Sequence, residues 1–127
     1  MQLTQKLKEG KEQKEKLVHF KSDYKKDDLV ITANLLLFVR SADNYIEVYF
    51  LEDGKVKMQM VRSSLRNAEL ATKEYDFIAK CHRTFIVNIN HIKEVQGSSQ
   101  GLKLTFEGVD FPVLVSQNYI RNIEKLI

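Results

Sequence analysis

The sequence is poor in the features that define several classes of protein. It has one cysteine, Cys81, so an internal disulfide is excluded and a reducing, cytoplasmic environment is expected. No apolar run approaches the roughly 20 residues that span a bilayer. The first twenty residues are rich in Lys, Glu and Gln and lack the apolar centre of a signal peptide. These absences favour a globular cytoplasmic protein with one compact domain.

An excess of charge of one sign is also missing. The net charge is +3. Residues 1–28 contribute +2, from eight Lys and six Asp or Glu, and residues 29–127 contribute +1, from twelve Lys or Arg and eleven Asp or Glu. A nucleic-acid-binding protein with this balance must gather its cations on one face, because its bulk charge attracts a polyanion only weakly. The balance therefore neither supports nor excludes DNA binding.

Hydrophobic patterning divides the chain into an N-terminal extension or linker, residues 1–28, and a domain, residues 29–127. Residues 1–17 are polar and carry no repeating apolar seam, which predicts a solvated helix or a linker, with a dimerising helix as the alternative. From Val18 onward the apolar period becomes two, as in β-strands. The predicted strands cover residues 18–21, 29–31, 35–39, 45–51, 56–61, 77–88, 91–95, 102–106 and 111–115.

Two helices complete the predicted, mainly β fold. The first runs from Leu65 to Thr72 and is capped by Ser63 or Ser64. A closing helix covers residues 117–127, with Ser116 as its cap. Asp53-Gly54 marks a tight hairpin turn, and the single proline, Pro112, fits an edge strand or the start of a strand.

The segment Lys80–Asn90, KCHRTFIVNIN, is the most informative part of the chain. It places His82 and Arg83 directly before a strand-forming run, Phe85–Val87. Polar groups at the start of a buried strand usually lie at a surface edge, where a group that reads a groove would be found. Adjacent strand residues point to opposite faces, so both side chains reach one ligand only if a bulge or turn intervenes.

Four ordered blocks carry a resemblance to a known family. They are Phe38–Val48 (FVRSADNYIEV), Val61–Leu65 (VRSSL), Cys81–Asn88 (CHRTFIVN) and Phe111–Ser116 (FPVLVS). Together they resemble the LytTR DNA-binding domain of bacterial transcription regulators over residues 29–127. The resemblance implies an elongated stack of small antiparallel sheets with short helices, in which loops and strand ends, rather than a recognition helix, read DNA.

The resemblance also implies partners. We expect sequence-specific binding of double-stranded DNA for transcription regulation, at direct-repeat promoter sites and as a homodimer on DNA, without a cofactor, metal or small-molecule substrate. The chain lacks the receiver domain common in the family, so it is expected to be a stand-alone regulator or the end of a longer protein. Membrane association is expected only in the second case.

Carried over position by position, the resemblance assigns three DNA-reading segments. They are a loop at residues 42–45, the pair of residues 82 and 83, and the start of the closing helix. Their residues are Asn44, Tyr45, His82, Arg83, Ser116, Gln117 and Asn118. Family members usually have one or two arginines after the serine, where this chain has Gln117 and Asn118. Because Arg pairs with guanine and Asn or Gln with adenine, we expect either a shift toward adenine or weaker binding.

Further residues are candidates for phosphate contacts. Arg62, Ser64 and Arg66 surround a helix N-terminus, where amides and two cations can clamp a phosphate. Lys80, Arg121 and Lys125 are further backbone candidates.

Some of the reading residues have structural alternatives. Arg83 can form a surface ion pair with Glu74 or Asp76. The His82 ring can bond a neighbouring loop and hold Arg83 in place. Ser116 can serve mainly as a helix cap.

Two other functions compete with DNA reading. His82, Asn88, Asn90 and His91 loosely resemble a His-Asn-His nuclease, but β-like sequence follows where that motif needs a helix. No Gly-rich phosphate loop, Ser/His/Asp set or carboxylate pair stands out either, so a non-enzymatic protein is expected. Cys81, His82 and His91 lack the spacing of a zinc site. The second alternative is a protein–protein interaction module with a degenerate DNA surface, favoured by the near-neutral charge and the missing arginines.

Overall fold

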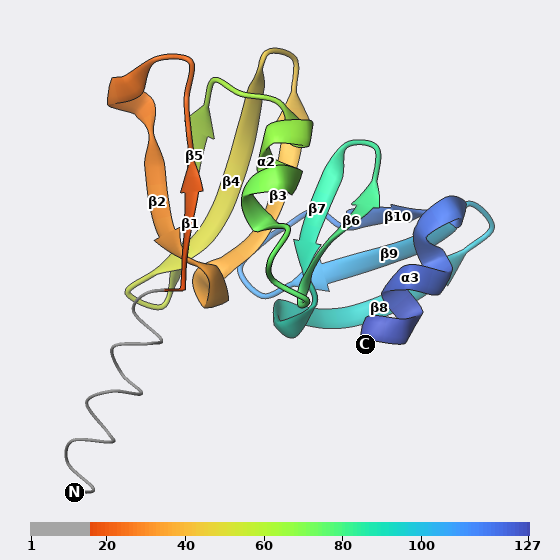
Figure 1. The fold of residues 1–127 in the computed structure, drawn as a ribbon. Helices are drawn as coiled ribbons and strands as arrows, with labels where there is room; N and C mark the ends of the chain where they lie inside the picture. Colours follow the sequence, from red (N-terminus) through yellow and green to blue (C-terminus); the bar gives the residue numbers. More distant parts are fainter. Residues whose placement is uncertain (1–15) are drawn as a thin grey trace, which may run out of the picture.

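The computed structural model describes residues 16–127, so the predicted helix or linker over residues 1–17 lies almost entirely outside the described part. The elements are β1 Leu17–Phe20, η1 Lys25–Asp27, β2 Leu29–Thr32, η2 Ala33–Leu35, β3 Leu36–Ala42, β4 Tyr45–Glu52, β5 Lys55–Val61, α2 Leu65–Thr72, β6 Ile78–His82, β7 Phe85–Asn88, η3 Ile89–His91, β8 Ile92–Ser98, β9 Gly101–Phe106, β10 Val113–Ser116, η4 Gln117–Tyr119 and α3 Ile120–Leu126 (Figure 1).

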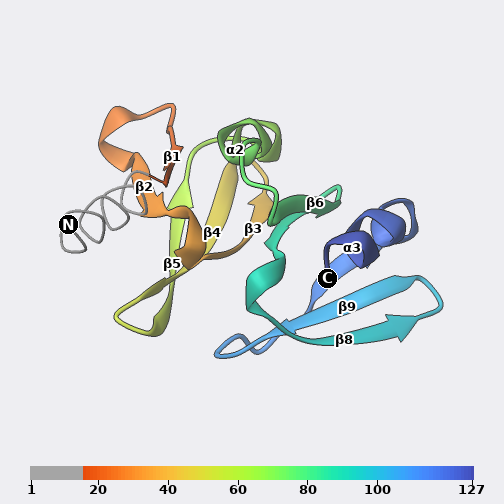
Figure 2. The ribbon, with the colours of Figure 1, turned by 60° about the horizontal axis from the view of Figure 1, so that its bottom comes forward.

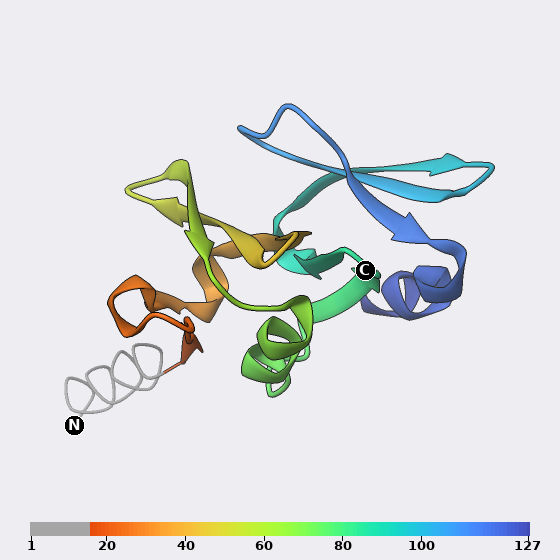
Figure 3. The same ribbon diagram turned by 90° about the horizontal axis from the view of Figure 1, so that it is seen from above.

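Within residues 16–127 the strands form antiparallel sheets of two, three and five strands. The five-stranded sheet has the order β5-β4-β3-β7-β6, the three-stranded sheet the order β10-β9-β8, and β1 pairs with β2. Seen from above, the body built on β3–β5 and the body built on β8–β10 lie side by side, with β6 and β7 between them (Figure 3). The expected stack of small antiparallel sheets with short helices is confirmed.

The first hydrophobic core lies between one face of the five-stranded sheet, the β1–β2 hairpin and α2. Strand β4 alternates as its sequence predicts, and Ile46, Val48 and Phe50 are buried. From β1, Val18 and Phe20 are also completely or almost completely buried in this core. Packing therefore starts upstream of the predicted division between residues 28 and 29.

The second core joins the five-stranded sheet to the three-stranded sheet and α3. Phe38 is at its centre, with ring centroids 4.4 Å from Tyr49 and 5.2 Å from Phe106. Ile123 of α3 is fully buried in the same cluster, and Figure 2 shows α3 running alongside β8 and β9. This shared core fixes the position of the three-stranded sheet relative to β6 and β7.

Strand β7 contributes to both cores, which explains its continuous apolar sequence. Ile86 faces the first core, whereas Phe85 and Val87 face the second. A strand covered on both faces reads as an unbroken apolar run rather than an alternating one.

Two predicted elements are wrong in their boundaries. The single strand predicted over residues 77–88 is a hairpin, β6 and β7, with Arg83 and Thr84 in its turn. The closing helix predicted over residues 117–127 is broken into η4 and α3, and Ser116 makes no side-chain capping hydrogen bond. Leu65–Thr72 is helical as predicted, and the cap is Ser64, whose Oγ accepts a hydrogen bond from the amide of Asn67.

Candidate nucleic-acid interface

Three segments that are far apart in sequence lie along one rim of the molecule, which we call the reading rim. They are the β3–β4 turn at Asp43 and Asn44, the β6–β7 turn at Arg83 and Thr84, and the segment Ser116–Asn118. In Figure 1 both turns point to the top of the view, and the start of the closing helix lies at the upper right.

The β3–β4 turn connects a tight pair of strands, in which Ala42 is opposite Tyr45. Asp43 has φ 57°, in the left-handed region that Asp tolerates better than most residues. Asn44 is exposed and Tyr45 is half-buried. The guanidinium of Arg62 lies 5.6 Å from the centre of the Tyr45 ring. Arg62, predicted to contact phosphate, thus also supports the side of this turn.

Arg62 also makes a cation–π contact with a second aromatic ring. Its guanidinium lies 5.3 Å from the ring of Tyr24, and its carbonyl accepts a hydrogen bond of 3.0 Å from the amide of Asp23. Sequence reasoning missed Tyr24, because nothing local links the β1–β2 loop to residues 45 and 62.

The β6–β7 turn presents Arg83. Its side chain is exposed and forms no ion pair with any residue in 16–127, including Glu74 and Asp76. The His82 ring bends back under the turn, where its Nδ1 lies 3.1 Å from the Thr84 amide nitrogen and 2.8 Å from Thr84 Oγ1. The turn therefore begins at Arg83, directly after His82. The His82 ring makes a structural contact, but with Thr84 of its own turn and not with a neighbouring loop.

Burial favours the neutral form of the His82 ring. Removal from water lowers the pKa of His82 below its usual value of 6.5, and the positive charge of Arg83 lowers it further. A cleft of about 110 Å³ separates this ring from the third segment and is lined by His82, Lys103 and Ser116 among others. This cleft thus lies between His82 and the third reading segment.

The third segment follows the end of β10. Ser116 is half-buried and pairs with Gly101, whose φ is 146°. A Cβ at position 101 would lie 2.0 Å from the Val115 carbonyl oxygen, so only glycine allows this approach. Gln117 Nε2 donates a hydrogen bond of 3.2 Å to the Ser99 carbonyl, whereas Asn118 is exposed. One N–H of the Gln117 side-chain amide is thereby engaged within the protein.

Hydrogen bonds tie the three segments together. The amide of Ser41 donates to the Thr84 carbonyl over 2.9 Å, joining the end of β3 to the β6–β7 turn. The buried thiol of Cys81 lies 3.4 Å from the Leu114 carbonyl oxygen and joins β6 to β10. Burial raises the pKa of Cys81 to about 12, so the group is a protonated donor. The second reading segment is the link between the first and the third.

The residues predicted to contact phosphate lie at several separate places. Arg66 and Lys80 line one groove of about 420 Å³ between α2, β6 and η4, and Lys73 lines it too. Ser64 uses its hydroxyl to cap α2, so its contribution to an anion site would come from the helix start rather than its side chain. Arg121 is exposed on α3. Sequence reasoning missed Lys73, which follows the helix without a motif of its own.

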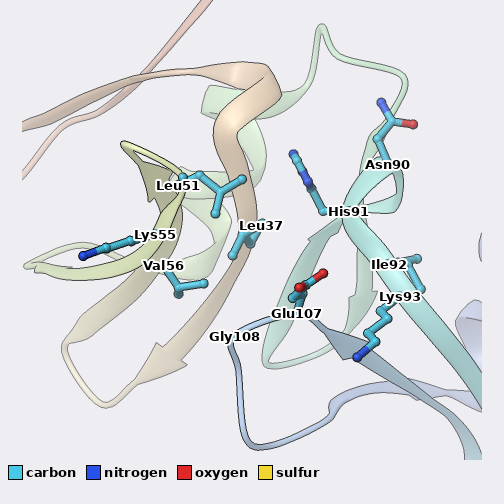
Figure 4. Close-up of a pocket in the computed structure, with 11 residues that line it drawn as sticks. Leu37, Leu51, Lys55, Val56, Asn90, His91, Ile92, Lys93, Glu107 and Gly108 are labelled. Atoms are coloured by element: carbon cyan, nitrogen blue, oxygen red, sulfur yellow. The ribbon is translucent and has the colours of Figure 1, made fainter.

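The opposite rim of the molecule, at the β4–β5 turn and η3, carries a different feature. A cavity of about 750 Å³ lies there (Figure 4). Leu37 and Val56 are on one side of it, and His91 and Lys93 are on the other. His91 and His82 are therefore at opposite ends of the β7 region. Within residues 16–127, no group of three or more His, Cys, Asp or Glu side chains is arranged to hold a metal ion.

Asn88, the second residue of the nuclease-like pattern, is fully buried. Its Nδ2 donates to the Leu36 carbonyl over 2.9 Å, and its Oδ1 accepts from the Asn90 amide over 2.9 Å. The pattern of His82, Asn88, Asn90 and His91 is thus dispersed, and its asparagine serves to anchor η3.

In the described part of the chain, each helix is too short or too polar to cross a bilayer.

Comparison with known proteins agrees with this geometry. The sequence profile of the LytTr DNA-binding domain matches residues 26–127. A "Sensory transduction protein LytT" from Bacillus anthracis is 30% identical over 142 residues, covering 98% of this chain and 55% of the relative. The chain thus spans about half the length of that relative.

A solved structure shares the fold. It is described as the LytTr DNA-binding domain of a putative methyl-accepting/DNA response regulator from Bacillus cereus, and it is similar with a TM-score of 0.66 and 24% sequence identity. The match covers 88% of this chain and 96% of the other. The profile match over residues 26–127, most of the sequence, shows that the chain belongs to the LytTR family of DNA-binding domains.

Proposed function

We propose that the chain regulates transcription by binding double-stranded DNA sequence-specifically through the reading rim. The observation that carries this proposal is that the two turns and the start of the closing helix are distant in sequence, yet hydrogen bonds join them and both turns point to the same side of the molecule (Figure 1). One duplex can touch all three only if they share a side. Sheet-borne turns would then enter the grooves in place of an inserted helix.

Within this rim, Arg83 is the main candidate for reading a base. It is exposed and has no carboxylate partner in the described residues, so its guanidinium keeps its full set of donors. Arg commonly forms a bidentate contact to guanine O6 and N7. Asn118 is the candidate for adenine, because the amide of its neighbour Gln117 already donates to Ser99.

The remaining predicted residues would contribute around these two. Asn44 and Tyr45 would contact the groove or the sugar-phosphate backbone from the first turn. Arg66, Lys80 and Arg121 would contact phosphates, with Arg62 held between two rings beside the first turn. Such contacts position the protein without specifying sequence. Ser116 and His82 would act mainly by supporting their neighbours.

We extend the proposal to a dimer of this chain that binds paired direct-repeat sites in a promoter.

The relative from Bacillus anthracis is about twice as long as the matched region, and it is described as a sensory transduction protein. Control by an upstream signal, in this chain or through a partner, would fit that likeness.

Selection of bound duplexes from a random pool tests the proposal. The wild-type chain should enrich one motif, and Arg83→Ala should relax the preference at one position while the rest of the motif persists. A uniform loss over all sequences would make Arg83 a phosphate contact instead. If the wild-type chain enriches no motif at all, the proposed function is wrong.

The second candidate function is a protein–protein interaction module. The observation that favours it is the third segment, where Gln117 and Asn118 replace the arginines usual in the family and Gln117 bonds within the protein. Salt separates the two functions, because DNA binding weakens steeply as salt rises whereas an apolar protein interface does not.

A further inference from the structure

Thr84 is the meeting point of the β6–β7 turn and the end of β3. Its amide and its hydroxyl both lie within hydrogen-bond distance of His82 Nδ1, at 3.1 and 2.8 Å, and its carbonyl accepts from the Ser41 amide at 2.9 Å. Every polar group of this residue therefore faces inside the turn or toward β3. Each of these three polar groups thus has a partner within the protein.

These contacts constrain both reading turns at once. Arg83 lies between His82 and Thr84, so the hydrogen bonds across it fix the backbone from which its side chain projects. Ser41 precedes the β3–β4 turn by one residue, and its bond to Thr84 fixes the offset between that turn and Arg83. Neither turn can shift along the rim without breaking a hydrogen bond.

We propose that Thr84 and the neutral His82 ring are positioning residues for base recognition, which set the direction of Arg83 and its offset from the β3–β4 turn. The inference rests on the proposed function, since it concerns how the reading rim discriminates between duplexes. It adds a residue outside the family-derived set, Thr84, and gives His82 a defined chemical state.

The tautomer of His82 follows from the backbone N–H that Thr84 donates to its ring. A backbone N–H can only donate, so Nδ1 must carry its lone pair toward Thr84, and the ring proton belongs on Nε2. Protonation of Nδ1 would set one N–H against another. The charged group that acts on the ring is a cation, Arg83 in the turn. The charged residue in the cleft lining is Lys103, and this lining includes no carboxylate that would favour imidazolium.

The first test compares duplexes that differ at one base pair. Thr84→Val removes the hydroxyl but keeps shape, and Thr84→Ser restores the hydroxyl. We expect Thr84→Val to reduce the preference for the favoured base at the Arg83 position by about fivefold, the factor for one net hydrogen bond. Thr84→Ser should recover most of it, and the salt slope should stay unchanged in both.

A matched control removes a hydroxyl elsewhere. Thr105 Oγ1 on β9 is buried and lacks a hydrogen-bond partner among residues 16–127, so Thr105→Val makes the same chemical change outside the reading rim. It should leave base preference unchanged. Equal effects of the Val variants at 84 and 105 would overturn the positioning role, as would a Thr84→Val protein that discriminates like the wild type.

The second test needs no DNA. Nitrogen-15 NMR of the free chain at neutral pH should show His82 with an unprotonated Nδ1 and a protonated Nε2. The opposite tautomer, or a charged ring at pH 7, would overturn the inference whatever the chain binds. An Arg83→Ala protein with unchanged base preference would also overturn the inference, because Arg83 would then read no base. If instead the wild-type chain enriches no motif while the tautomer is as expected, the proposed function fails and the geometry of the turn stands.

Discussion

The two rims of the molecule are both polar and both carry cations, yet they differ in how these cations are held. At the reading rim, Arg83 projects from a turn whose neighbours are fixed by side-chain and backbone hydrogen bonds. At the opposite rim, Lys55 and Lys93 surround a cavity of about 750 Å³ together with Glu107. The difference teaches that the number of cations does not identify a nucleic-acid surface. A guanidinium that projects from a fixed turn and has no carboxylate beside it is a more specific indication of a nucleic-acid surface.

The largest contrast between the rims should come from Arg83→Ala. At the reading rim we expect a loss of about 1–3 kcal/mol in affinity for the preferred duplex, the usual value of one bidentate base contact. Lys93→Ala at the opposite rim should have almost no effect on the same duplex. Fluorescence anisotropy titrations of both variants measure the difference. Comparable losses at the two rims would remove the distinction on which the proposed function depends.

A gain is expected where the chain departs from the family. Asn118→Arg should shift the preference at one position from adenine toward guanine, because the guanidinium matches guanine O6 and N7. If the new charge meets a phosphate instead, the slope of log K against log salt should steepen by about 0.9 without a change in sequence preference. Titrations at several salt concentrations distinguish the two. An unchanged affinity and slope would place residue 118 away from the DNA.

Acidification should weaken the reading rim through His82. Its folded-state pKa lies below 6.5, so the folded protein binds fewer protons than the unfolded chain between that pKa and 6.5. The contribution to stability is fully present above about pH 6.5 and is lost as the pH falls through the lowered pKa. His82→Asn keeps an acceptor near the Nδ1 position and cannot titrate.

Urea denaturation at pH 7.5 and pH 5 measures this effect. The wild-type chain should lose more stability on acidification than His82→Asn. Every other group is the same in the two proteins, so its contribution cancels in the difference. Equal pH dependence in the two would show that the ring is not held in its neutral form.

The smallest effect is predicted outside both rims. Thr105→Val removes a buried hydroxyl without a partner in the described residues and should stabilise the fold by about 1 kcal/mol. Thermal denaturation measures the change, and DNA affinity should not follow it. If affinity rises or falls with stability in this variant, binding differences at the rims need correction for folding before they are compared.

Sequence reasoning identified the strands and the helix at Leu65–Thr72, because alternation and the Ser64 cap are local signals. It failed at Arg83, where a two-residue turn lies inside what reads as one apolar strand run. The hairpin has no Gly or Asn to mark it, and its stability comes from the ring of His82 and from β3 pairing with β7. Those contacts are tertiary and leave no mark in the local pattern.

The candidate site shows the same division. The fold joins the three segments named from family motifs by hydrogen bonds. The motifs say nothing about which polar groups are already engaged. Gln117 donates to Ser99, eighteen positions away, and Arg62 lies beside Tyr24, from a loop before β2. Such pairings depend on how hairpins meet across the two cores, and only the folded arrangement reveals them.

Because the proposed reading rim is assembled from residues near 44, 83 and 117, it exists only in the completed fold. A fragment that lacks β7 should not retain it, since this strand pairs with β3 and β6 and enters both cores. Occupancy of the rim by a duplex should therefore raise the melting temperature of the whole chain and not of one hairpin alone.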